Sequence, residues 1–239
     1  MSMGCKWYLA TTAAEMSAQP PAHPIAWMAC HFSSAGSGLS NLPPMLPEDS
    51  LVIVDDSTPF TDHDPQRIAA QLAGLGTLSG VLLDLQREAE GIEALLHCLT
   101  ETLSCPVAVT EAYGHKADCA VFLSAPLNMP LENAIAPWKN RQIWLDIPFG
   151  VQTFTVTEKG CRISGICPTE ETSLPHWDQN LHCKYGVQVQ ADRICFTLQR
   201  TSDALDAILQ EASNLQIPIA ISLLQEYGFA IDESGEKES

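Results

Sequence analysis

Eight short apolar runs recur along the chain, most of them followed by polar residues or by a helical pattern. They lie at residues 7–11, 25–31, 51–54, 81–83, 106–110, 119–123, 142–147 and 217–224. Runs that are apolar along their whole length are typical of parallel strands, because both faces of a parallel sheet are covered. The alternation of these runs with loops and helical segments predicts βα units around a parallel sheet.

Apolar residues at helical spacing predict amphipathic helices between some of the strands. One helix is expected to begin at Asp64-Pro65, where Asp is a good N-cap and Pro suits the first helical position. A second is expected after residues 78–90, and a third after Ser202, which would cap it. The apolar positions of these helices are Ile68, Ala69, Leu72 and Leu75; Ile92, Leu95, Leu96, Leu99 and Leu103; and Leu205, Ile208, Leu209 and Ala212.

Residues 151–199 follow a different pattern, in which apolar and polar residues alternate as in half-buried antiparallel strands. Lys159-Gly160 and Ala191-Asp192 supply the turns of two hairpins. The sequence thus predicts an α/β fold: an irregular (β/α)8 TIM barrel with several helices missing or shortened, and a small antiparallel β insertion before the last helix and strand. We expect a single domain over residues 1–231 and a disordered acidic tail at 232–239.

The stretch at residues 78–90 changes from an apolar run to polar residues at Asp84, Gln86 and Glu88. The C-terminal ends of strands carry the chemistry in α/β folds. Residues two apart share one face of a strand, so these three side chains are predicted to point into one site. The alternative is that Glu88 begins the next helix, where an acidic residue interacts favourably with the helix dipole.

Other carboxylates follow neighbouring strands of the predicted barrel. Asp55 and Asp56 come directly after the run at 51–54, and Glu111 follows the run at 106–110. Because parallel strands end at the same edge of a sheet, these groups are expected to lie near the end of the 78–90 stretch. The predicted ligand-binding residues are Asp84, Gln86, Glu111, Asp55 and Asp56.

Residues 80–86, with the sequence GVLLDLQ, resemble the fourth-strand signature of the family 18 glycoside hydrolases, the group of chitinases and spore-cortex lysins. That signature reads Gly, an aliphatic residue, Asp, an aliphatic residue, Asp, an aromatic or aliphatic residue, and Glu. Asp84 matches the second aspartate of the signature. Leu82 replaces the first aspartate, and Gln86 replaces the glutamate that is the family's general acid.

Two further segments extend the resemblance to roughly residues 78–225. Residues 142–150 resemble the segment that ends the family's seventh strand, and residues 196–221 resemble its closing helix-and-strand pattern. The resemblance implies a TIM barrel and a glycan ligand that contains N-acetylglucosamine. The family's Met-x-Tyr-Asp and its last-strand Trp fall near residues 123–126 and 222–224, which contain neither the Tyr-Asp pair nor the Trp.

These replacements predict that catalysis has been lost. Glutamine cannot donate a proton as a general acid, and leucine cannot stabilise a charged intermediate. Glutamine can still hydrogen-bond a hydroxyl or an N-acetyl group. The leading hypothesis is therefore a catalytically inactive barrel that binds carbohydrate or acts as a scaffold.

Two other hypotheses stay open. An active glycosidase could use relocated carboxylates, either Glu88 with Asp84, if the motif is shifted by two residues, or Asp55 with Asp56. Alternatively, the barrel serves protein interactions without a small ligand, if aromatic side chains plug its mouth. The aromatic candidates for such a plug are Phe32, Tyr113 and Trp144.

The formal net charge of −17 argues against nucleic acids and anionic membranes as partners, because both require a basic surface. No apolar run reaches about 18 residues, and residues 1–10 do not resemble a signal peptide. We therefore expect no membrane span and a cytoplasmic location, with export of a protein whose leader was removed as the alternative. The sequence predicts no oligomeric state.

The nine cysteines are odd in number and scattered, which favours reduced thiols over a disulfide framework. Four lie in apolar contexts and are expected in the core: Cys30, Cys98, Cys119 and Cys195. A group of His176, His182 and Cys183 could bind zinc, but its spacing fits no standard site. We expect no metal and no cofactor.

Overall fold

A closed barrel of eight parallel strands is the main feature of the computed structural model, which describes residues 4–18, 23–34, 38–167 and 173–227. Neighbouring strands follow the order β1-β14-β8-β7-β6-β5-β4-β2, and β1 also pairs with β2. This ring confirms the predicted (β/α)8 barrel. The barrel strands are β1 (Lys6–Thr11), β2 (Ile25–Phe32), β4 (Leu51–Asp55), β5 (Gly80–Asp84), β6 (Val107–Thr110), β7 (Ala120–Ser124), β8 (Ile143–Asp146) and β14 (Ile219–Leu223).

The chain divides into two compact units, which are described separately below. The N-terminal unit comprises Trp7–Leu123 and Trp138–Leu145. The C-terminal unit comprises Met1–Lys6, Ser124–Pro137 and Asp146–Ser239. That residues 1–231 form one domain stays a prediction, and the predicted acidic tail at 232–239 lies outside the described residues.

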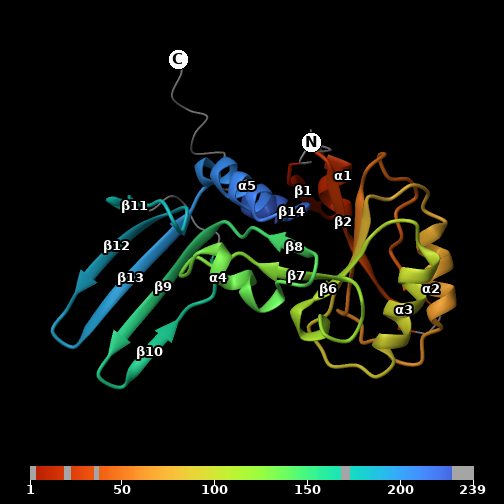
Figure 1. The fold of residues 1–239 in the computed structure, drawn as a ribbon, viewed down its shortest axis with the longest axis horizontal. Helices are drawn as coiled ribbons and strands as arrows, with labels where there is room; N and C mark the ends of the chain where they lie inside the picture. Colours follow the sequence, from red (N-terminus) through yellow and green to blue (C-terminus); the bar gives the residue numbers. More distant parts are fainter. Residues whose placement is uncertain (1–3, 19–22, 35–37, 168–172, 228–239) are drawn as a thin grey trace, which may run out of the picture. The chain divides into compact units, whose positions relative to one another are not determined.

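In the N-terminal unit, α2 (Pro65–Ala73) and α3 (Ile92–Thr102) cover the outer face of β4, β5 and β6 (Figure 1). Val54 and Leu83 point outward and share one buried cluster with residues of both helices. Alternate strand residues point the other way, into the barrel, so both faces are covered and the strands are apolar throughout. Asp64 caps α2 as predicted, because its side chain accepts the N–H of Gln66.

Shorter elements complete this unit. They are α1 (Ala13–Ala18), η1 (Glu111–Tyr113), and β3 (Leu39–Ser40), which pairs antiparallel with β2. Trp144 of β8 is fully buried, and its ring lies against Gly80 at the first position of β5. A side chain at Gly80 would collide with this ring, so the residue has to be glycine.

In the C-terminal unit, five antiparallel strands form a separate sheet in the order β10-β9-β13-β12-β11. The two predicted hairpins and the insertion are confirmed. The three-residue strand β11 was not predicted. The strands are β9 (Gly150–Thr157), β10 (Gly160–Ile163), β11 (His176–Asp178), β12 (Cys183–Val189) and β13 (Arg193–Arg200).

Helices of the C-terminal unit are α4 (Leu131–Ile135) and α5 (Leu205–Asn214), with the short 3-10 turn η3 (Ser202–Ala204). A second 3-10 turn, η2 (Ala136–Trp138), begins in this unit, and its last residue is assigned to the N-terminal unit. The prediction that Ser202 caps the last helix is wrong. The N-cap position of α5 belongs to Ala204, because the chain first makes the 3-10 turn that begins at Ser202.

One face of the antiparallel sheet is apolar and exposed. Val156 lies opposite Ile194, and Phe196 lies opposite Val187, so their side chains share this face. These four side chains are 37–46% exposed, and Val189 is 75% exposed. Alternation therefore predicted the strands correctly, although the apolar positions are only partly covered.

All nine cysteines are free. Cys30, Cys98 and Cys119 are buried as expected, and burial raises the pKa of Cys30 to about 12. Cys195 is only half-buried, because it lies on β13 of the insertion. Within the described part of the chain, no helix is long and apolar enough to cross a membrane.

Candidate carboxylate site at the barrel strand ends

Two carboxylates meet at the C-terminal ends of β4 and β5 in the N-terminal unit. Asp55 and Asp84 are register partners, and His31 of β2 is the register partner of Asp55. Val54 and Leu83 point outward to the helices, so the residues that follow them point into the barrel. The predicted proximity of Asp55 and Asp84 is therefore present in the structure.

Asp84 carries an unusual electrostatic environment. Its pKa is raised above the ordinary aspartate value, mainly because burial disfavours the charged form. A hydrogen bond from Gln86 opposes this shift, whereas the nearby charges of Asp55 and Asp56 add to it. The site thus contains one carboxyl group that is easier to protonate than an ordinary aspartate.

Gln86 reaches this carboxyl group from beyond the strand. Its Nε2 donates a hydrogen bond of 2.8 Å to Asp84 Oδ1. β5 ends at Asp84, so the expectation that Gln86 and Glu88 continue one strand face is wrong. The chain leaves the strand there because a buried carboxylate captures the next backbone N–H groups.

That buried carboxylate belongs to Asp56, which is only 6% exposed. Its Oδ2 accepts the N–H groups of Gln86 at 3.0 Å and of Arg87 at 2.7 Å. The interaction fixes the loop at 85–90 and holds Gln86 beside the strand end. Asp56 therefore supports the loop from within.

Two side chains that the sequence analysis did not assign to the site hold the same loop. Thr110, at the end of β6, donates its hydroxyl to the Leu85 carbonyl at 2.8 Å. The Tyr113 hydroxyl donates to the Arg87 carbonyl at 2.6 Å and accepts the Ala89 N–H at 2.9 Å. The only available signal was that Thr110 ends the β6 run and Tyr113 follows it closely.

The other predicted residues have different surroundings. Asp55 Oδ1 accepts the Ser57 N–H at 2.8 Å. Glu111 lies on η1 and is exposed, and its Oε1 accepts the ring N–H of Trp138 at 3.3 Å. Glu88 lies in the loop between β5 and α3, so it neither extends the strand nor begins the helix. Its side chain is exposed and lines a surface depression of about 690 Å³.

The three aromatic residues considered as a plug are all buried. Phe32 packs edge-on against Phe60, with ring centroids 5.0 Å apart, in the cluster between barrel and helices. Tyr113 holds the 85–90 loop, and Trp144 lies against the N-terminal end of β5.

The weak zinc candidate separates into three unrelated environments. His182 hydrogen-bonds Glu211, Cys183 is buried near Leu127, and the His176 ring lies against Tyr185. Across the described ranges, no group of three His, Cys, Asp or Glu side chains is placed to hold a metal ion.

Chemically, the strand-end site offers a carboxyl group, a carboxamide and a second carboxylate from Asp55. A carboxamide donates and accepts hydrogen bonds, and a carboxylate accepts them. This set suits a ligand with hydroxyl or amide groups. Burial raises the pKa of Asp84, so this carboxyl group takes up a proton more readily than an ordinary aspartate.

Comparison with known proteins gives structural likeness without a sequence match: no family model and no curated protein sequence matches the chain. The chitinase-like agglutinin RobpsCRA from Robinia pseudoacacia superimposes with a TM-score of 0.57 and 10% identity, covering 95% of this chain and 97% of that one. The spore cortex-lytic enzyme SleL of Bacillus cereus gives a TM-score of 0.55 and 8% identity over 97% of this chain and 75% of that one.

A chitinase from Chromobacterium violaceum shares the fold as well, with a TM-score of 0.50 and 13% identity, over 98% of this chain and 100% of that one. The chain therefore shares the barrel fold of these proteins. This agrees, at the level of fold, with the resemblance of residues 78–225 to the family 18 glycoside hydrolases.

Proposed function

We propose that this protein is a catalytically inactive, glycoside-hydrolase-like barrel that binds an N-acetylglucosamine-containing glycan at Asp84 and Gln86. The observation that carries the proposal is the 2.8 Å hydrogen bond from Gln86 Nε2 to Asp84 Oδ1. In the signature that residues 80–86 resemble, a glutamate general acid stands where this chain has Gln86. An amide there binds polar groups but supplies no proton.

The pair can recognise sugar groups directly. Gln86 uses one N–H on Asp84, and an amide has a second N–H and a carbonyl oxygen to offer. The carboxylates of Asp84 and Asp55 accept hydrogen bonds from hydroxyl or acetamido N–H groups. Asp56 and Tyr113 fix the loop that carries Gln86, and such preorganisation lowers the entropic cost of binding.

The structural neighbours support a carbohydrate ligand without deciding between hydrolysis and binding. One is a chitinase and another is an agglutinin described as chitinase-like. In this proposal, glutamine at position 86 is the reason why the protein binds the glycan without hydrolysing it.

One observation favours the second candidate, an active glycosidase with relocated carboxylates, but with Asp55 and Asp84 as the pair in place of the two pairs expected from the sequence. Asp55 and Asp84 lie on adjacent paired strands, which are about 4.8 Å apart in a sheet. Retaining glycosidases use two carboxyl groups about 5 Å apart, one of which has a raised pKa. The raised pKa of Asp84, caused first by burial, fits such a role.

A thermal-shift titration with N-acetylglucosamine oligomers tests the proposal. At about 100 times the dissociation constant a ligand stabilises the native state by about 2.7 kcal/mol, which corresponds to roughly 5–10 °C for a chain of this size. Gln86→Ala and Asp84→Ala are expected to abolish the shift. Glu88→Gln is the matched control, because Glu88 is exposed outside the strand-end site.

Turnover measurements on the same samples separate the candidates. The proposal expects binding without product release. Hydrolysis that is lost in Asp55→Asn and follows a pH–rate profile with two carboxyl ionisations would establish the active glycosidase instead. If no glycan raises the melting temperature, the proposal fails, and a protein partner becomes the hypothesis to test.

A further inference from the structure

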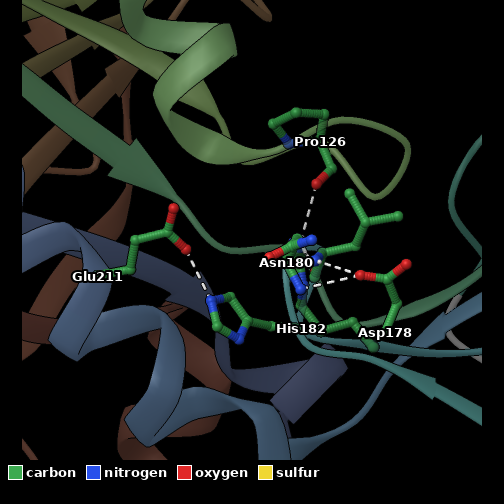
Figure 2. A network of polar contacts seen from close by, with 7 residues as sticks. Pro126, Asp178, Asn180, His182 and Glu211 are labelled. Atoms are coloured by element: carbon green, nitrogen blue, oxygen red, sulfur yellow. Dashed lines mark hydrogen bonds and ion pairs between the residues drawn. The ribbon is translucent and has the colours of Figure 1, made fainter.

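A depression lined mainly by polar and charged residues lies in the C-terminal unit and has no role in the proposed glycan site. It has a volume of about 640 Å³ and lies between the start of α4, the turn that joins β11 to β12, and one face of α5. Figure 2 shows the turn and α5 meeting where His182 faces Glu211. All of its lining residues belong to the C-terminal unit.

The turn that forms one wall is held by hydrogen bonds to two side chains, those of Asp178 and Arg200. Asp178 Oδ1 accepts the N–H groups of Asn180 at 2.9 Å and of Leu181 at 3.1 Å (Figure 2). Arg200, which is only 3% exposed, donates to the carbonyl groups of Leu181 and Pro126. The backbone from Asp178 to His182 is thus fixed before any ligand arrives.

His182 completes this wall in a strained conformation. Its φ of +49° is in the left-handed region, which non-glycine residues seldom adopt. The conformation directs the imidazole Nε2 to Glu211 Oε2 on α5 at 2.7 Å. Both side chains remain partly accessible, at 18% and 26% exposure, so they contribute to the surface of the depression.

Each of the three segments that line the depression presents a carboxamide. Asn133 comes from α4, Gln179 from the turn, and Gln210 from α5, where it also donates to Asn214 Oδ1 at 3.1 Å. Carboxamides offer both donors and acceptors in fixed pairs. Three segments of the chain therefore bring the same kind of group to one depression.

The charges of the lining restrict the ligand. The lining contains Glu132, Glu211 and His182 but no Lys or Arg, so a phosphate, sulfate or carboxylate ligand would find no stable positive partner. It contains no aromatic ring of Phe, Tyr or Trp, so flat ring stacking is not used. Alternating donors and acceptors match the hydroxyl groups of a sugar.

We propose that this depression is a second binding site, specific for a neutral polyhydroxylated ligand the size of one or two sugar units. Gln179 and Gln210 are the principal hydrogen-bonding residues, and Asn133 of α4 is the third. The Glu211–His182 pair fixes the orientation of α5 relative to the turn and accepts or donates to one hydroxyl. This site does not rest on the proposed function, because no residue of the N-terminal unit contributes to it.

Side-chain amide signals in a proton–nitrogen NMR spectrum of the full chain provide the test. The probes are glucose, galactose, mannose and N-acetylglucosamine, each titrated into the millimolar range. Gln179→Ala and Gln210→Ala each remove one pair of amide signals and thereby assign it. In the unsubstituted chain we expect one of these sugars to shift both assigned pairs, and each substitution to weaken its binding at least fivefold.

Gln188→Ala is the matched control, because Gln188 is an exposed glutamine of β12 that does not line the depression. His182→Asn is a second variant, since Asn tolerates the left-handed conformation and the protein should remain folded. It is expected to weaken sugar binding while the melting temperature changes little.

Three results would overturn the proposal: none of the sugars shifts the Gln179 and Gln210 signals, sugar binding is unchanged in the variants, or spermidine shifts them where sugars do not. The last result would indicate a cationic ligand. Gln86→Ala separates the two sites, because it removes oligomer binding at the barrel without changing the signals of Gln179 and Gln210.

Discussion

Two loops of this molecule are each anchored by one buried charged side chain, and the charges have opposite signs. In the N-terminal unit, the carboxylate of Asp56 accepts backbone N–H groups of the 85–90 loop. In the C-terminal unit, the guanidinium of Arg200 donates to the carbonyl groups of Ala125, Pro126 and Leu181. Each charge is tolerated inside the protein because backbone groups of the complementary kind surround it.

The two anchors are not equally satisfied. Both acceptor bonds of Asp56 come from adjacent residues of one loop, so it holds a single short segment. Arg200 joins two segments far apart in sequence, and burial lowers its pKa to about 10. Its Nε is buried and finds no acceptor among the described residues. Arg200 therefore connects more of the chain than Asp56 does, and its burial has a larger desolvation cost.

Replacing Arg200 with Met gives the largest expected effect. The substitution removes the donor from the carbonyl groups of buried Ala125 and half-buried Pro126 and Leu181. An acceptor left without its donor costs roughly 1–3 kcal/mol, so the expected total is about 3–5 kcal/mol. Urea unfolding followed by circular dichroism measures the loss. Arg193→Met is the control, because Arg193 is exposed at the start of β13. Equal stabilities of the two variants would contradict the anchoring role.

Asp56→Ala tests the other anchor and is expected to cost less, about 2–3 kcal/mol. It leaves the N–H groups of Gln86 and Arg87 without their acceptor, and each such loss costs roughly 1–3 kcal/mol, reduced where water can replace the carboxylate. Asp62→Ala is the control, because Asp62 is exposed in the same loop between β4 and α2. It should change the free energy of unfolding by less than about 0.5 kcal/mol. A variant as stable as this control would show that Asp56 does not hold the loop.

Tyr113→Phe removes a single hydroxyl from the same loop, and the expected cost is about 1–2 kcal/mol. The hydroxyl serves the Arg87 carbonyl and the Ala89 N–H, both within the 85–90 loop. A double-mutant cycle with Asp56→Ala should therefore give a coupling energy of about 0.5 kcal/mol or more. Strict additivity would mean that the two residues hold independent segments.

The sequence predicted the barrel because its strands are covered on both faces. Val54 and Leu83 pack against helices while their neighbours point inward, and this produces the unbroken apolar runs. It also located Asp84 and Asp55 correctly, since strand ends in a parallel sheet share one edge.

The features that the sequence did not predict depend on contacts between residues far apart in the chain, which no local pattern reveals. β5 ends at Asp84 because Asp56, about thirty residues earlier, captures the following N–H groups. Arg200 reads as an ordinary polar residue after an alternating strand, and its burial depends on carbonyl groups from a segment 74 residues earlier. The turn at 178–182 likewise had no periodic signal.

The smallest effect is expected for Asp84→Asn, and it should depend on pH. The folded-state pKa of Asp84 is raised by burial and by the charges of Asp55 and Asp56, so ionisation of this group opposes folding above that pKa. Asn carries no charge and can still accept the Gln86 hydrogen bond. The variant should therefore melt roughly 1–3 °C higher than the wild type at pH 7.

This gain must disappear as the pH falls, because Asp84 is neutral in both the folded and unfolded states below the unfolded pKa of about 3.9. Melting curves of both proteins between pH 7 and pH 3.5 measure the difference, with Asp62→Asn as the control. A gain that persists at low pH would arise from packing. A variant less stable than the wild type at pH 7 would mean that the ionised carboxylate is stabilised by its neighbours. In that case Asp84 would stay ionised at pH 7, and the strand-end site would accept hydrogen bonds from a ligand more strongly than expected for a buried carboxyl group.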